Sequence, residues 1–70
     1  MTNEQERIRI GLRIAELRKE RDWTQEELAK RCNLGRSHIA RIERGMYNIQ
    51  LDTLSIIAGA FGMTIDFVKH

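Results

Sequence analysis

The sequence predicts an all-α fold, a compact bundle of five helices. Three observations favour it: the 70 residues include no proline, no run of β-branched residues alternates with polar ones, and apolar residues recur at three- and four-residue spacing. A chain of this length holds one domain at most, and a single core of this size gives marginal stability. We therefore expect residues 1–70 to form one domain, with residues 1–6 frayed.

The first helix is expected from Glu6 to about Arg21. Its inward side carries Ile10, Ile14 and Leu17. A rotation of about 100° per residue puts Arg18 on this same apolar side, so this arginine needs a partner. Gly11 costs a helix about 1 kcal/mol relative to alanine. It marks either a close approach by another backbone or a harmless surface position.

A capping box begins the second helix, which is expected to span residues 25–32. Thr24 and Glu27 have the required spacing, in which the hydroxyl accepts from an early amide and the carboxylate reaches back. Asn33 suits the left-handed position that ends a helix. Trp23 lies just before the cap, where packing against Leu28 is a simpler expectation than stacking on a ligand.

The third helix is expected from Arg36 to Arg44, between Gly35 and Gly45. Its inward side combines two apolar residues with one acid: Ile39, Ile42 and Glu43. Glu43 and Arg18 are thus opposite charges on two inward faces, and pairing them satisfies both. A desolvated charge left alone costs several kcal/mol, so buried charges should be found together. The alternative is that one or both side chains reach water.

After a loop at residues 46–50, the fourth helix is expected from Leu51 to Phe61. Its apolar stripe consists of Leu51, Leu54, Ile57, Ala58 and Phe61, and Gly62 ends it. Thr64 can cap a short fifth helix over residues 65–68.

Composition excludes several classes of function. No apolar run approaches the roughly 20 residues of a membrane helix, and the N-terminus lacks the features of a signal peptide, so we expect a cytoplasmic protein. One cysteine, Cys32, and two histidines, His38 and His70, make a metal site improbable. Because the usual catalytic motifs are missing, we expect neither an enzyme nor a cofactor. On the inward side of a helix Cys32 is a core residue more often than a redox sensor.

Basic residues are concentrated in the middle of the chain, although the formal net charge is only +2. Between residues 28 and 51 one acid, Glu43, stands against Lys30, Arg31, Arg36, Arg41 and Arg44. Such a local excess suggests a polyanionic partner. The outward side of the third helix carries Arg36, Ser37, Arg41 and Arg44, a set that fits the major groove of DNA. On charge alone, a solvated surface that binds nothing explains this set as well as DNA binding does.

Four motifs occur in a characteristic order: R-I-x-x-L-R, T-Q-E-E-L-A, I-x-R-I-E-R-G and L-D-T-L. In this order they strongly resemble the XRE-type helix-turn-helix family of phage repressors and Cro proteins. The resemblance covers residues 10–68. It implies a five-helix bundle whose third helix enters the major groove, and it also includes the Arg18–Glu43 pair that the helical faces suggest.

Roles for individual residues follow from this resemblance alone. Base reading falls to Arg36, Ser37 and Arg41, with His38 a weaker candidate that is nearly as well explained as a flank residue. Phosphate contacts fall to Gln25, Arg44, Tyr47 and Asn48. The chain departs from the family where Gly35 replaces a capping Ser or Thr and Ile49 replaces a common proline. Ile56 and Phe67 are large apolar residues at usually polar positions, so they form a dimer surface or are partly buried in the monomer.

The expected function is that of a transcriptional regulator that binds double-stranded DNA in a sequence-specific manner. The protein would act as a homodimer on a two-fold operator, either blocking RNA polymerase or touching it. Restriction-modification controller proteins and short phage or plasmid repressors are similar small regulators. The alternative from another class is an antitoxin-like module that binds a protein, with DNA binding secondary.

Overall fold

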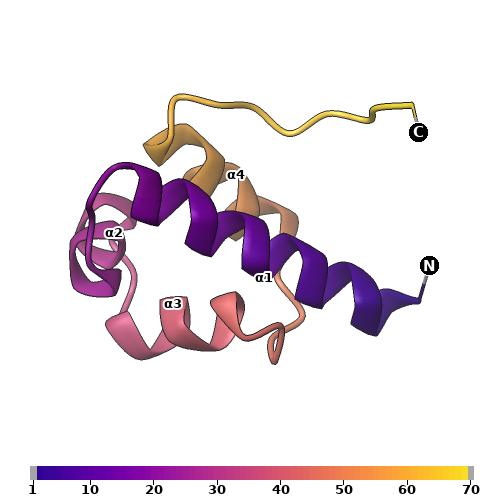
Figure 1. The fold of residues 1–70 in the computed structure, drawn as a ribbon, viewed down its shortest axis with the longest axis horizontal. Coiled ribbons are helices and arrows are strands. Elements are labelled where there is room, and N and C mark those ends of the chain that lie inside the picture. Colours follow the sequence, from indigo (N-terminus) through magenta and orange to yellow (C-terminus); the bar gives the residue numbers. More distant parts are fainter. Residues whose placement is uncertain (1, 70) are drawn as a thin grey trace.

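The computed structural model describes residues 2–69 as a bundle of four helices (Figure 1). They are α1 (Asn3–Glu20), α2 (Gln25–Cys32), α3 (Arg36–Glu43) and α4 (Leu51–Ala60). The predicted all-α class is confirmed, whereas the fifth helix expected over residues 65–68 is wrong. In Figure 1 α1 crosses the middle of the molecule and α3 forms its lower edge.

Helix α1 begins three residues earlier than expected because a second capping box precedes it. Thr2 Oγ1 accepts a hydrogen bond from Gln5 N at 3.1 Å, and Gln5 Oε1 accepts one from Thr2 N at 2.8 Å. Two of the unpaired amides at the helix start are thereby satisfied. The helix ends before Asp22, whose φ is 57°.

Helix α2 has the predicted bounds, and the predicted capping box is present. Thr24 Oγ1 accepts from Glu27 N, and Glu27 Oε1 accepts from Thr24 N, both at 3.1 Å. Asn33 adopts the left-handed conformation with φ 56°. Helix α3 starts at the predicted residue and ends one residue early, before a turn in which Gly45 has φ 72°.

The core lies where α1, α2 and α3 meet, and it continues onto α4. Its most deeply buried side chains are Leu28, Ile39, Ile42 and Ile57. Helix α3 packs against both α1 and α2, while α4 packs against α2. One side of α3 is therefore fixed by two helices, which leaves its other side to solvent.

Gly11 marks the closest approach between α1 and α3, which settles the question that the sequence left open. A Cβ atom at this position would collide with the carbonyl oxygen of Ile42 and would lie 2.8 Å from that of Glu43. Both obstacles are backbone atoms, which cannot rotate away. Glycine therefore lets α3 lie directly against α1.

The chain after α4 has no helix over residues 63–69, in contrast to the prediction. A four-residue helix forms too few hydrogen bonds to offset the cost of its nucleus. A local hydrogen bond from Phe67 N to Asp66 Oδ1, at 2.7 Å, competes with the helical pattern. The segment instead runs back toward the N-terminal end of α1 (Figure 1).

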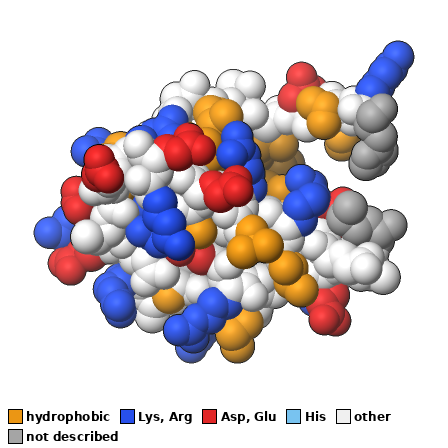
Figure 2. All heavy atoms as spheres, viewed as in Figure 1, with side chains coloured by type: hydrophobic (Ala, Val, Ile, Leu, Met, Phe, Trp, Pro, Cys, Tyr) orange, Lys and Arg blue, Asp and Glu red, His pale blue; other side chains and the backbone are white. Residues whose placement is uncertain are grey.

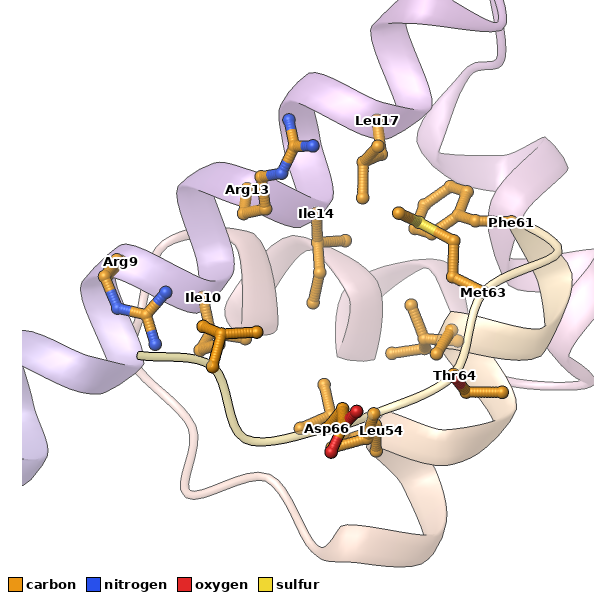
Figure 3. Close-up of a pocket in the computed structure, with 14 residues that line it drawn as sticks. Arg9, Ile10, Arg13, Ile14, Leu17, Leu54, Phe61, Met63, Thr64 and Asp66 are labelled. Carbon is orange, nitrogen blue, oxygen red and sulfur yellow. The ribbon is translucent and has the colours of Figure 1, made fainter. Parts of the chain in front are cut away.

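An apolar groove of about 260 Å³ lies between α1, α4 and this C-terminal segment (Figure 3). Ile10, Ile14 and Leu17 line it from α1, and Met63 lines it from the segment. Large apolar side chains of α4 and the C-terminal segment stay exposed: Leu51 at 69%, Ile56 at 49% and Phe67 at 101%. Leu51 was expected on the buried stripe. It is the first residue of α4, about one turn before Leu54, and its side chain is exposed.

In residues 2–69 none of the helices combines the length and the apolar character that crossing a bilayer requires.

Candidate nucleic-acid interface

The outward side of α3 carries four exposed polar or cationic residues: Arg36, Ser37, Arg41 and Arg44. Among residues 2–69 none of these three arginines forms an ion pair. In Figure 2 basic side chains lie along the lower edge of the molecule, where α3 runs. The face that the sequence predicted is therefore assembled, and its guanidinium groups are free to bind an anion.

The inward side of α3 is held by the ion pair between Arg18 and Glu43. Arg18 Nε donates to Glu43 Oε2 at 2.7 Å, and Arg18 Nη2 donates to Oε1 at 3.0 Å. The two side chains are only 11% and 6% exposed. Arg18 Nη1 also donates to the carbonyl oxygen of Trp23 at 2.8 Å. This two-point geometry meets the condition under which buried opposite charges are tolerated.

Gln25 joins this ion pair, which sequence reasoning missed. Its Nε2 donates to Glu43 Oε1 at 3.0 Å. An amide group has two N–H donors, so one remains for a phosphate at the start of α2. The residue that the family resemblance assigns to the DNA backbone is therefore also tied to the buried link between α1 and α3. No local sequence pattern predicts the contact between Gln25 and Glu43, because the two residues are 18 positions apart.

His38 differs from the other predicted base-reading residues because its ring turns toward the loop after α3. The His38 ring meets the Tyr47 ring edge-on, with centroids 4.6 Å apart and an interplanar angle of 64°. His38 Nε2 is buried and has no hydrogen-bond partner in the described part of the chain. A base edge is read by an accessible donor or acceptor, which this nitrogen does not offer.

The remaining predicted phosphate-binding residues flank the exposed face. Arg44 ends α3, and Asn48 is exposed in the loop that leads to α4. Tyr47 in the same loop is half-buried. The loop follows the C-terminal end of α3 and contacts it through the Tyr47 and His38 rings.

Trp23 packs against the core cluster that includes Leu28. Its ring stacks on Phe61 with centroids 5.9 Å apart, and the guanidinium of Arg31 lies 4.1 Å from its centroid. Arg21 links α1 to the end of α4, because it donates to the carbonyl oxygens of Leu17 and Phe61, both at 2.9 Å. Arg31 was counted with the basic excess, but this stacking gives it a structural role as well.

Cys32 is buried in the core, as its inward position suggested. Burial raises the pKa of its thiol, because the apolar surroundings disfavour the thiolate. Since the thiolate is the reactive form, this environment makes Cys32 unreactive and disfavours the alternative of a redox sensor.

Comparison with known proteins gives a match over most of the chain. Residues 14–68 match the sequence profile of a helix-turn-helix family. The immunity repressor of Bacillus phage phi105 is 48% identical over 59 residues, which are 84% of this chain and 41% of the repressor. Control protein C.BamHI of Bacillus amyloliquefaciens is 38% identical over 58 residues, which are 81% of this chain and 72% of that protein. The chain thus spans less than half of the phage repressor but most of the control protein.

Solved structures include close matches of the same kind. The restriction-modification controller protein C.AhdI from Aeromonas hydrophila gives a TM-score of 0.81 at 32% identity, covering 84% of this chain and 89% of that one. Controller protein C.Esp1396I, solved as a tetramer in complex with its natural 35 base-pair operator, gives a TM-score of 0.76 at 32% identity. That match covers 81% of this chain and 75% of the other.

Proposed function

The chain belongs to the XRE-type helix-turn-helix family, and we propose that it is a sequence-specific regulator of transcription that binds double-stranded DNA. The observation that carries the proposal is the exposed arginine face of α3, held rigidly from behind by α1 and α2. The C.Esp1396I complex with its operator supports it. In this proposal α3 enters the major groove, where an arginine can make a two-point contact with a guanine.

Two groups of side chains have different roles, base reading and phosphate binding. Arg36, Ser37 and Arg41 read base edges from the outward side of α3. Gln25, Arg44, Tyr47 and Asn48 hold the phosphates on either side. Phosphate contacts fix the position of the protein, while base contacts specify the sequence. The protein acts as a homodimer, because two copies related by a two-fold axis bind two half-sites.

The dimer surface is the exposed apolar region that includes Ile56 and Phe67. Phe67 is fully exposed and Ile56 is 49% exposed, so both side chains offer apolar surface to a second copy. A second copy would remove this apolar surface from water. The bound dimer then controls transcription by occupying a promoter, either blocking RNA polymerase or touching it.

Replacing Arg41 with alanine is expected to weaken DNA binding by about 1–3 kcal/mol and to relax preference at one base pair of each half-site. Binding is measured by fluorescence anisotropy on duplexes that vary at single positions. The control is Lys19→Ala, which removes one positive charge from the exposed side of α1. An Arg41→Ala protein with an unchanged preference would refute its base-reading role.

Gln25→Ala should weaken binding to all duplexes with little change in preference, because a phosphate contact carries no sequence information. Gln25 also donates a hydrogen bond to Glu43, so the substitution can destabilise the fold. The unfolding midpoint of the Gln25→Ala protein must therefore be measured on the same sample.

The rival function is a protein-interaction module of the antitoxin kind, and a salt titration separates the two. Arg44 is the one cation among the proposed phosphate-binding residues, so a dimer neutralises two phosphates through it. Raising the salt from 50 to 200 mM then lowers affinity about 10-fold. A flat salt dependence would favour the protein-binding role, which does not require phosphate contacts.

A further inference from the structure

His38 and Tyr47 form one unit that joins α3 to the loop behind it. They are nine positions apart, and the turn at Gly45, with φ 72°, brings the loop back against α3. The two rings meet edge-on at 4.6 Å, a favoured arrangement for aromatic pairs. Because His38 Nε2 has no hydrogen-bond partner among the described residues, packing against Tyr47 defines the position of the imidazole ring.

The Tyr47 hydroxyl forms no hydrogen bond with residues 2–69, and it is not among their buried polar atoms without a partner, so it is accessible to solvent. The ring contact is thus a means of fixing the direction of the Tyr47 side chain beside the exposed end of α3.

From this geometry we infer that His38 is a positioning residue, which orients the Tyr47 hydroxyl toward a DNA phosphate instead of reading a base itself. The inference rests on the proposed DNA-binding function. It replaces the base-reading role that the resemblance gives to His38 with a contact that is the same for every sequence. A tyrosine side chain that is already held in one direction loses less conformational entropy when its hydroxyl binds a phosphate.

Two conservative substitutions separate positioning from base reading. His38→Phe keeps an aromatic ring against Tyr47 but removes both ring nitrogens, so affinity and base preference should stay within about 2-fold of the natural protein. Tyr47→Phe keeps the packing but removes the hydroxyl, so affinity should fall about 5-fold on every duplex, as for one net hydrogen bond. The probes are a duplex recovered from a random library and one of unrelated sequence.

The double variant completes the test. His38→Ala should weaken binding to both duplexes by about as much as Tyr47→Phe, and combining the two should cost no more than Tyr47→Phe alone, because both act through one contact. Thermal unfolding of each variant separates loss of fold from loss of binding. A purely structural contact would lower the unfolding temperature of His38→Ala and leave Tyr47→Phe with full affinity.

Three results would overturn the inference: a changed base preference in His38→Phe, full affinity in Tyr47→Phe, or additive losses in the double variant. All three leave DNA binding by the natural protein intact. If the natural protein itself shows no salt-dependent binding to either duplex, the proposed function fails and the inference fails with it.

Discussion

Glu43→Ala is expected to remove about 3–5 kcal/mol from the free energy of unfolding, because breaking a buried pair leaves an uncompensated charge. Arg18 would lose two hydrogen bonds and keep only the one to Trp23, with its side chain 11% exposed. A domain of this size has about 3–5 kcal/mol to lose. Urea titration followed by circular dichroism should therefore find the variant largely unfolded without denaturant.

The matched control is Glu16→Ala, which breaks an ion pair on the surface of α1. Glu16 accepts from Arg13 at 3.0 Å, but the side chains are 64% and 51% exposed, and exposed pairs contribute about 0–1 kcal/mol. A double-mutant cycle with Arg18→Met and Glu43→Leu measures the buried pair directly. A coupling energy near zero, or equal losses in Glu43→Ala and Glu16→Ala, would show that the pair does not hold α3.

Gly11→Ala should destabilise the protein even though alanine is the better helix former. The gain in helix propensity is about 1 kcal/mol. Against it stands a Cβ atom that would meet two backbone carbonyls of α3, so the helices must move apart. Overpacking a close contact costs about 1–3 kcal/mol or more, and here no flexible side chain can yield. The net effect should be a clear fall in the urea midpoint.

Gly59→Ala provides a control of opposite sign. Gly59 lies in α4, and no atom outside its own helix is within 4 Å of the position that its Cβ would take. The same substitution should therefore raise the free energy of unfolding by up to about 1 kcal/mol. If Gly11→Ala raises the free energy of unfolding as Gly59→Ala does, the close approach of α1 and α3 at Gly11 is not a constraint on packing.

The features predicted correctly from the sequence rest on short-range rules. The capping box at Thr24 and Glu27 and the left-handed Asn33 define α2 because each acts within one helical turn. The meeting of Arg18 and Glu43 could also be predicted, although they are 25 positions apart. Helical rotation put both charges on inward faces, and burial leaves opposite charges few other partners.

Other features depend on packing that no local rule contains. The sequence left Gly11 undecided, because only the position of the α3 backbone shows what a side chain would meet. His38 was assigned by its position on α3, and its edge-on contact with Tyr47, nine positions later, has no local signature. The fifth helix was wrong because a capping threonine, Thr64, cannot compensate for so short a segment. By contrast, the Thr2–Gln5 capping box is visible in the sequence and was missed.

The most direct test of the central claim, that the outward side of α3 reads DNA as part of a two-fold dimer, is selection of bound sequences from a random duplex library. The full chain is incubated with the library, and bound duplexes are recovered and sequenced over several rounds. We predict a palindromic site whose half-sites are centred about one helical turn apart. Recovery of no common sequence, or of a single unpaired half-site, would contradict a two-fold, sequence-specific regulator.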